Sequence, residues 1–325
     1  MTQQGLNRDA GRNPAIPPID NLDKCRNILA CTECQSPLDM APAVTQVTCL
    51  RCGKQYPIIS GVPVMLKGSD AAAINIGANA QPARSVLRKL PLIGRFLRWV
   101  LNPPAGLINV AAAENYRCLR EMLSGLDHPK LLFVGGADGL GFGSIHLGQK
   151  LLQSVINTDV ALMPGVDLVA DGHCLPFVDE SFDGVVVQSV LQHTREPKVV
   201  VDEILRVLRP GGCVYSEIPF LQRYYPGYDF QRLTLEGLEF LFRDFEAIRT
   251  GISNGPASAL AHVGAYAFAA LLAFRSEAFY KILVTTFRWA FAPLRYLDWL
   301  VKDHEHSVEV AGGFYFLGRK QQGAH

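Results

Sequence analysis

A glycine-rich stretch that follows an apolar run constrains the fold of this chain more than any other segment. Residues 130–143 read Lys-Leu-Leu-Phe-Val-Gly-Gly-Ala-Asp-Gly-Leu-Gly-Phe-Gly, so an apolar run leads directly into closely spaced glycines. This order is typical of a buried parallel strand that ends in a tight loop. Glycine suits such a loop because it adopts positive φ and lets the backbone approach a ligand. A helix predicted to begin near Gly139 would then present free N–H groups to an anionic ligand.

A purely structural turn would show the same pattern, so the motifs that follow decide between the two interpretations. A second short strand is predicted to end at Asp159, about 20 residues after the glycines, where a carboxylate that binds ribose is expected. Further motifs come in a fixed order along the chain. They are Asp171-Gly172-His173-Cys174-Leu175-Pro176-Phe177, Ser181-Phe182-Asp183-Gly184-Val185-Val186-Val187, Leu191-Gln192-His193 and Glu203-Ile204-Leu205-Arg206-Val207-Leu208-Arg209-Pro210-Gly211-Gly212.

In this order and spacing the motifs resemble the class I S-adenosylmethionine (SAM)-dependent methyltransferases, especially the large type 11 group. The resemblance covers about residues 110–251. It implies a Rossmann-like α/β domain with a seven-stranded sheet, SAM as the cofactor, and transfer of a methyl group to an acceptor. Two positions depart from the family pattern: Phe133 stands where the family has an acid, and Ala137 stands in place of the middle glycine.

The resemblance also implies a set of cofactor-binding residues at the carboxyl ends of the strands. The glycines would shape the turn against the methionine end of SAM, and the acid after the second strand would bind the ribose hydroxyls. The acid after the third strand would contact the adenine, and the end of the fourth strand would lie beneath the sulfonium. The residues assigned in this way are Gly135, Gly136, Gly139, Asp159, Asp171, Gly172, Gln188 and Ser189.

Methyl transfer demands little acid–base chemistry from the protein, because the sulfonium is already activated and in-line positioning supplies most of the rate. A hydroxyl acceptor would nevertheless benefit from a general base. The candidates are His193, His173 and Glu217, and the sequence does not choose among them. His193 matches the place of a histidine that is as often structural in the family.

Residues 219–243, just after the predicted fifth strand, carry several aromatic side chains, with the acid Asp229 and the arginine Arg232 among them. The end of this strand lies above the expected position of the transferred methyl group. Two interpretations remain open for the segment, an acceptor-binding loop and a structural loop.

Four cysteines near the N-terminus predict a metal site. Cys31-x-x-Cys34 and Cys49-x-x-Cys52 are two pairs separated by 14 residues. Their four thiolates can close a tetrahedral Zn²⁺ site and leave no coordination position open for catalysis, so the zinc would be structural. The surrounding sequence resembles the zinc-ribbon activator proteins of tRNA and protein methyltransferases, which here would be fused to the catalytic domain.

Composition divides the chain into four predicted segments. Residues 1–24 are polar and lack periodicity, which predicts a disordered tail. Residues 25–68 would form the zinc ribbon, residues 69–106 a linker, and residues 107–325 the methyltransferase domain. A basic amphipathic stretch in the linker is compatible with an anionic membrane, with RNA phosphates, or with the solvated face of an inter-domain helix.

The last strand of the sheet is predicted unusually far from the sixth. Residues 245–251 read as the sixth strand and residues 313–319 as the seventh, so residues 252–311 form a helical insertion. The sixth strand ends, and the seventh begins, at the carboxyl edge of the sheet. The insertion is therefore expected to emerge beside the site.

Within the insertion, Lys281, Arg288, Arg295 and Lys302 recur at intervals of seven residues among large aromatic side chains. This spacing predicts one cationic stripe on a helix, which Pro293 should kink. An interfacial membrane helix and a soluble lid over the site both fit the pattern.

Charge is distributed unevenly although the net charge is only +1. Residues 1–106 carry 12 basic and 6 acidic side chains, residues 107–253 carry 12 and 19, and residues 254–325 carry 7 and 5. The acidic body disfavours nucleic acid as a partner. The chain shows no apolar signal segment, and its eight cysteines then favour a reducing compartment. The prediction is a cytoplasmic protein that the insertion could bring to the inner face of the membrane.

Three functions are compatible with these features. The first is O-methylation of a saccharide, a lipid-linked molecule or another small or amphiphilic acceptor, which the insertion favours. The second is an rRNA or tRNA methyltransferase, which the ribbon favours but the acidic body and the lack of an Asn-Pro-Pro-Tyr-type motif oppose. The third is a non-catalytic SAM-binding or scaffold protein, which Phe133 and Ala137 favour.

Overall fold

Seven strands form the central sheet, in the spatial order β6-β5-β4-β7-β8-β10-β9. All of them run parallel except β10, which pairs antiparallel with both β8 and β9. This arrangement confirms the predicted Rossmann-like α/β sheet. The strands are β4 (Leu131–Val134), β5 (Val155–Asp159), β6 (Leu168–Val169), β7 (Phe182–Gln188), β8 (Leu208–Pro219), β9 (Phe245–Asn254) and β10 (Gly313–Lys320).

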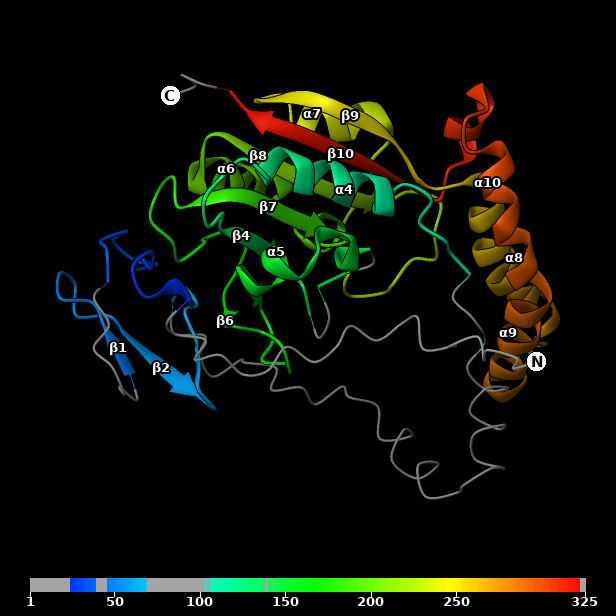
Figure 1. Ribbon diagram of the computed structural model, residues 1–325. Coiled ribbons are helices and arrows are strands. Elements are labelled where there is room, and N and C mark those ends of the chain that lie inside the picture. Colours follow the sequence, from blue (N-terminus) through cyan, green and yellow to red (C-terminus); the bar gives the residue numbers. More distant parts are fainter. Residues whose placement is uncertain are drawn as a thin grey trace, which may run out of the picture.

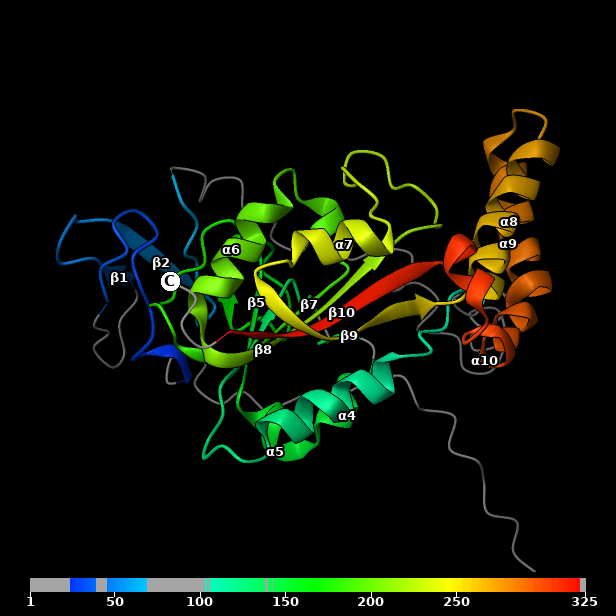
Figure 2. The same ribbon diagram turned by 90° about the horizontal axis from the view of Figure 1, so that it is seen from above.

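A computed structural model describes residues 24–38, 46–68, 103, 106–137, 140, 141 and 143–321. The predicted tail except Lys24, nearly all of the linker with its basic stretch, and Gly139 lie outside these residues. Helices cover both faces of the sheet, as Figures 1 and 2 show. Helices α4 (Ala112–Leu123) and α5 (Gln149–Gln153) lie on one face, and α6 (Pro197–Val207) and α7 (Leu235–Leu241) lie on the other.

Strand β4 is buried on both faces of the sheet, so helices must cover both faces. All four of its residues are buried, as expected for a parallel strand covered on both faces. Successive side chains point to opposite faces. Leu131 and Phe133 join the cluster that contains Tyr116 of α4, whereas Leu132 and Val134 join the cluster on the α6 side.

The helix predicted to begin near Gly139 does not form as expected. The described residues that follow the turn reach only a 3₁₀-helix, η3 (Ser144–Leu147), and then the short helix α5. Gly143 and Gly148 have φ of +92° and +79°, values that a right-handed helix does not accommodate. The glycines that favour a tight loop therefore also divide the helix that follows it.

The cysteine-containing unit packs directly on the edge of the central sheet. Its antiparallel strands are β1 (Gln46–Thr48), β2 (Gln55–Ile59) and β3 (Val62–Pro63). The N–H of Met65 donates to the carbonyl of Val169 on β6 at 2.8 Å. A second contact joins Leu29 to Phe177 through an isolated β-bridge. The unit and the sheet thus share one hydrophobic core.

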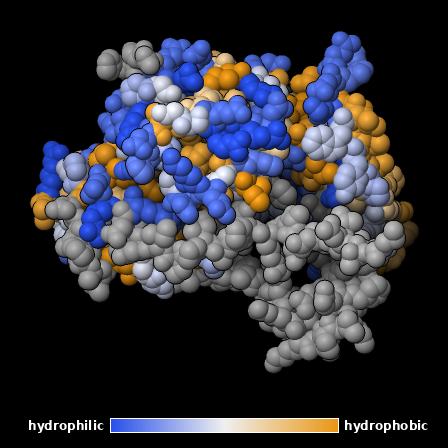
Figure 3. Space-filling model, viewed as in Figure 1, coloured by the Kyte–Doolittle hydropathy of each residue, from blue (hydrophilic) through white to orange (hydrophobic). Residues whose placement is uncertain are grey.

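The segment between β9 and β10 is helical, as expected. It contains α8 (Pro256–Leu272), α9 (Glu277–Phe291), η5 (Ala292–Leu297), α10 (Asp298–Val301) and η6 (Glu305–Val310). Helices α8 and α9 form a hairpin that projects from the end of the sheet toward which β7 points (Figure 1). Figure 3 shows apolar side chains gathered over this hairpin.

The predicted cationic stripe is not carried by one helix. Helix α9 ends at Phe291, and the chain continues as a 3₁₀-helix with Pro293 near its start. Proline lacks an N–H and therefore cannot extend the α-helical hydrogen bonding. Arg295 lies in that 3₁₀-helix and Lys302 only caps α10, so the spacing of seven does not place the four cations on one face.

We expect Phe177→Ala to destabilise the cysteine-containing unit and the central sheet together. Phe177 is fully buried, and its ring lies edge-on to that of Phe182 with centroids 4.9 Å apart. The loss should be about 3–5 kcal/mol of unfolding free energy, measured by denaturant titration. The exposed residue Val160 provides the control, because Val160→Ala should change this free energy by at most about 0.5 kcal/mol. Two separate transitions in the wild type would contradict a shared core.

Candidate functional site

The glycine turn follows the end of β4 and contacts two neighbouring segments. Gly135 has φ of +69°, and a Cβ on it would lie 2.3 Å from Cγ2 of Val190. A Cβ on Gly136 would lie 2.1 Å from Oδ1 of Asn157. Both N–H groups donate to the carbonyl of Thr158, at 2.8 and 3.1 Å. These positions therefore require glycine, and the turn is fixed to the end of β5.

Asp159 lies beside this turn at the end of β5. Its Oδ2 accepts a hydrogen bond from the N–H of Ala137 at 3.1 Å, and its Oδ1 accepts one from Ala161 at 3.0 Å. A carboxylate has about four lone-pair sites, so further donors can still bind. The structure brings Gly135, Gly136 and Asp159 together, and their role toward SAM stays a prediction.

Asp171 and Gly172 follow β6 at the same edge of the sheet. The Oδ1 of Asp171 accepts from the N–H of His173 at 2.9 Å and lies 2.6 Å from its Nδ1. His173 is therefore engaged with the carboxylate that the sequence assigns to adenine. A Cβ on Gly172 would lie 3.3 Å from side-chain carbons of both Val134 and Val200, so this position is tight.

Gln188 and Ser189 end β7, beside the buried candidate Glu217. The Oε1 of Gln188 accepts from the hydroxyl of Tyr116 at 2.5 Å, and the N–H of Ser189 donates to the carbonyl of Glu217 at 2.9 Å. The carboxylate of Glu217 accepts from Tyr215 and Asn109. Burial raises the pKa of Glu217 although these hydrogen bonds lower it. Glu217 belongs to a buried network and does not line the cavity next to it.

A cavity of about 370 Å³ opens beside Ser189. The loop after β8 supplies most of its wall, so this part of residues 219–243 borders a pocket. Of the three candidate bases, His193 lines the cavity. The full lining is Ser189, Gln192, His193, Pro219, Gln222, Tyr225, Tyr228, Asp229 and Arg232.

Asp229 is the acid of this segment to which the sequence assigned no role, and it lines the cavity. Its Oδ1 lies 3.0 Å from Nδ1 of His193, and its Oδ2 accepts from Arg232 at 2.6 Å. The spacing Asp-x-x-Arg within an aromatic segment was the one feature of the sequence that could have indicated a polar site here. It could not reveal the partner, because His193 comes from a different part of the chain.

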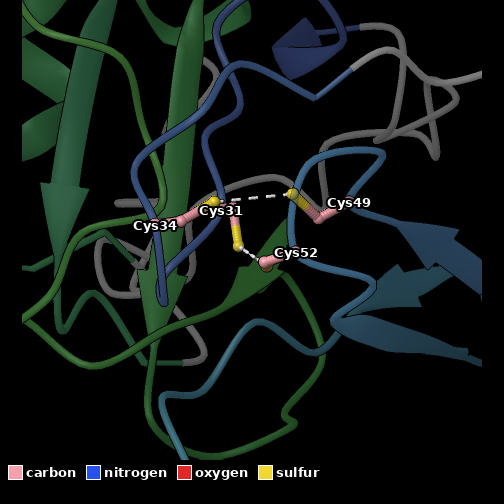
Figure 4. Close-up of side chains that lie close together, drawn as sticks. All are labelled: Cys31, Cys34, Cys49 and Cys52. Carbon is pink, nitrogen blue, oxygen red and sulfur yellow. Dashed lines mark hydrogen bonds between the residues drawn. The ribbon is translucent and has the colours of Figure 1, made fainter.

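The four cysteines of the N-terminal unit converge as predicted (Figure 4). All four Sγ atoms lie within 4.8 Å of one another, and the Cys31–Cys52 and Cys34–Cys49 pairs lie at 3.5 and 3.6 Å. Four sulfurs about 2.3 Å from a tetrahedral zinc would lie roughly 3.8 Å apart. The donor set therefore fits a structural zinc, whose binding stays a prediction.

Residues 145–216 match the family model described as "Methyltransferase domain". Over these residues the chain carries a methyltransferase domain. The matched region contains Asp159, Asp171, Gln188 and His193, and it begins after the glycine turn.

Two curated relatives are demethylmenaquinone methyltransferases. The protein of Clavibacter sepedonicus is 44% identical over 66 residues, which cover 18% of this chain and 26% of the relative. That of Renibacterium salmoninarum is 34% identical over 103 residues, which cover 29% of this chain and 38% of the relative. The chain thus spans about a quarter to two-fifths of the length of these relatives.

One solved structure that the chain matches is the complex between the Haloferax volcanii Trm112 methyltransferase activator and the putative methyltransferase. The match is 14% identical with a TM-score of 0.40, and it covers 65% of this chain and 92% of that chain.

We expect purified protein to contain one zinc ion per chain. Cys49→Ser should abolish this zinc, because three thiolates no longer close the tetrahedron. Elemental analysis after dialysis provides the measurement. Cys118→Ser is the matched control, since Cys118 lies on α4 outside the cluster and its replacement should leave the zinc content unchanged. Wild-type protein that folds without zinc would refute the site.

Proposed function

We propose that the protein is a SAM-dependent methyltransferase that O-methylates a saccharide, a lipid-linked molecule or another small acceptor. One observation carries the proposal: the glycine turn with Asp159, and the end of β7 with its cavity, stand on neighbouring strands at the same edge of the sheet. This is the edge at which open α/β sheets bind ligands.

The residues at this edge fit the cofactor. Asp159 and Asp171 are partly exposed, so their carboxylates can accept hydrogen bonds from the ribose hydroxyls and from the adenine end. Gly135 and Gly136 have no side chain, so the backbone there can lie close to the methionine end of SAM. Bound SAM would supply an activated methyl group, and the protein would orient it toward the cavity.

The cavity supports a small acceptor with a hydroxyl group. A volume of about 370 Å³ lies in the range of small-molecule sites. Tyr225 and Tyr228 offer apolar ring surface, whereas His193 and Arg232 offer polar atoms that can orient a hydroxylated ligand. The relatives named for demethylmenaquinone are also compatible with a small acceptor.

Asp159→Ala should weaken SAM binding by about tenfold or more, because it removes charge-assisted hydrogen bonds of roughly 1.5–3 kcal/mol. Isothermal titration calorimetry with SAM gives the affinity. Asp127→Ala is the control: the Asp127 side chain is 91% exposed, and its loss should not change binding. Equal SAM affinity in the wild type and Asp159→Ala would remove Asp159 from the proposed site.

We further propose that the hairpin brings the enzyme to an anionic membrane surface. Helix α8 contains no charged residue. Leu271 near its end and Phe274 in the turn after it are exposed, with exposed fractions of 76% and 84%. Four basic side chains and one acidic side chain lie within residues 255–297. No helix in the described parts of the chain is long and apolar enough to cross a bilayer. An apolar tip with net positive charge suits shallow insertion among anionic lipids.

Phe274→Ser should weaken binding to vesicles of anionic and zwitterionic phospholipid by about tenfold, since a buried phenyl ring contributes about 1.5–3 kcal/mol. Sedimentation with the vesicles measures the bound fraction, and added salt should lower it for the wild type. Phe240→Ser is the matched control, because Phe240 is 69% exposed but lies on α7 of the catalytic body. If the wild type does not bind anionic vesicles at low salt, the membrane proposal is wrong and the hairpin is interpreted as a soluble lid.

A further inference from the structure

We propose that His193 is the general base that accepts the hydroxyl proton of the methyl acceptor, and that Asp229 is the residue that positions it. The inference rests on the proposed function and adds to it the protein group that receives the proton. Four observations support it: the anchoring of Asp229, the two acceptors beside Nδ1, the position of Nε2, and the cavity that His193 lines.

Asp229 is held rigidly and is almost completely buried, with 3% of its side chain exposed. Its Oδ2 accepts from Arg232 at 2.6 Å and from the N–H of Tyr225 at 2.8 Å. Burial works to raise the pKa of Asp229, but these hydrogen bonds outweigh it and hold the pKa below its ordinary value. The side chain is therefore a fixed, charged carboxylate.

The loop that carries Asp229 is tied to the segment that carries His193, η4 (Leu191–His193). The N–H of Phe230 donates to the carbonyl of Gln192 at 2.8 Å. The side-chain amide of Gln231 donates to two carbonyls at the same segment, those of Leu191 and Thr194, both at 3.0 Å. The geometry between imidazole and carboxylate is thus set by backbone contacts on either side.

The surroundings of Nδ1 fix the tautomer of His193. Two atoms lie near Nδ1: Oδ1 of Asp229 at 3.0 Å and the carbonyl oxygen of Tyr228 at 3.1 Å. Both are acceptors. The hydrogen bond of Nδ1 goes to the carbonyl of Tyr228, whereas Oδ1 of Asp229 has no hydrogen-bond partner among the described residues and faces the ring as a buried charge. A carbonyl oxygen can only accept a hydrogen bond, so the proton resides on Nδ1. In the neutral ring this leaves the lone pair on Nε2.

Nε2 is placed where an acceptor in the cavity could reach it. It lies 3.0 Å from the amide nitrogen of Gln192, which also donates to the carbonyl of Ser189 at 2.8 Å. Both His193 and Gln192 line the cavity, and 41% of the His193 side chain is exposed. An acceptor hydroxyl would replace the Gln192 amide as the donor to Nε2.

The hydroxyl oxygen of the acceptor forms a bond to the methyl carbon, and the carbon–sulfur bond breaks with its electron pair going to sulfur. The hydroxyl proton passes to Nε2 of His193. The positive charge that leaves the sulfonium therefore appears on the imidazolium, where the carboxylate of Asp229 stabilises it.

Nuclear magnetic resonance of the full chain labelled with ¹⁵N-histidine tests the positioning without any acceptor. His193→Gln assigns the signal by its disappearance. The wild-type signal should show the proton on Nδ1 when the ring is neutral. Asp229→Asn should change the chemical shift of Nδ1, because Arg232 retains the amide oxygen and an uncharged amide nitrogen then faces the ring, while the Tyr228 carbonyl still holds the proton on Nδ1. A wild-type proton on Nε2, or no change in Asp229→Asn, would overturn the proposed role of Asp229.

Transfer of radiolabelled methyl from SAM to a bacterial lipid extract, and to a saccharide fraction, tests the base itself. His193→Gln should lower the rate by about 10²-fold or more, while calorimetry shows unchanged SAM affinity. Asp229→Asn should shift the midpoint of the rising limb of the pH–rate profile. The other charged or titratable side chains lining the cavity are Arg232, Tyr225 and Tyr228.

His306→Gln provides the matched control, since His306 is 66% exposed on η6 and its replacement should leave rate and profile unchanged. Wild-type rates in His193→Gln, with SAM binding intact, would overturn the base and leave the proposed function standing. A wild type that transfers no methyl group to either fraction would overturn both.

Discussion

The antiparallel pairing of β10 between β8 and β9 is the constraint on which the rest of the site depends. In register, Gly313 lies opposite Pro219 on one side and Asn254 on the other. The end of β8 and the start of β10 are thereby joined at the carboxyl edge of the sheet. The carbonyl of Gly312 then accepts from the N–H of Phe220 and the amide of Gln222, both at 2.9 Å, which directs the loop that walls the cavity.

The same pairing fixes the base of the hairpin beside this loop. The fully buried Asp298 accepts from the N–H groups of Ala257 and Ser258, at 2.8 and 3.1 Å, and so binds the start of α8 to the end of the helical segment. Arg223 of the loop lies between the rings of Tyr225 and Tyr266, 4.2 and 4.6 Å from their centroids. Because Tyr225 lines the cavity and Tyr266 belongs to α8, the hairpin and the cavity are in physical contact through one side chain.

At the β6 side of the sheet, opposite β9, the cysteine-containing unit pairs with the outermost strand. Strand β6 has only two residues, and Val64 pairs with Val169 on its open side. Buried valines from both units form a small cluster there. An exposed edge of this kind would otherwise present unpaired backbone groups. The cysteine-containing unit thus supports the strand that precedes Asp171, and its stability is linked to the proposed adenine end of the site.

Much of this architecture is determined by the sequence, because local patterns suffice to specify it. Apolar runs mark the strands, the glycines after Val134 mark the turn, and two Cys-x-x-Cys pairs mark the cluster, since each signal lies within a few residues. The delayed seventh strand was also predictable from its position after a helical segment. The boundaries of the segments and the roles of the site residues remain predictions.

Tertiary structure decided what periodicity alone could not. A spacing of seven suggested one cationic face, but the helix ended at Phe291 because proline follows. Glycines at positive φ divided the helix expected after the turn. Above all, only the folded chain brings Asp229 to His193, because the two lie on loops that follow different strands and meet through backbone hydrogen bonds. A sequence shows which residues can titrate or donate, whereas the sheet that aligns the ends of its strands determines which of them share one cavity.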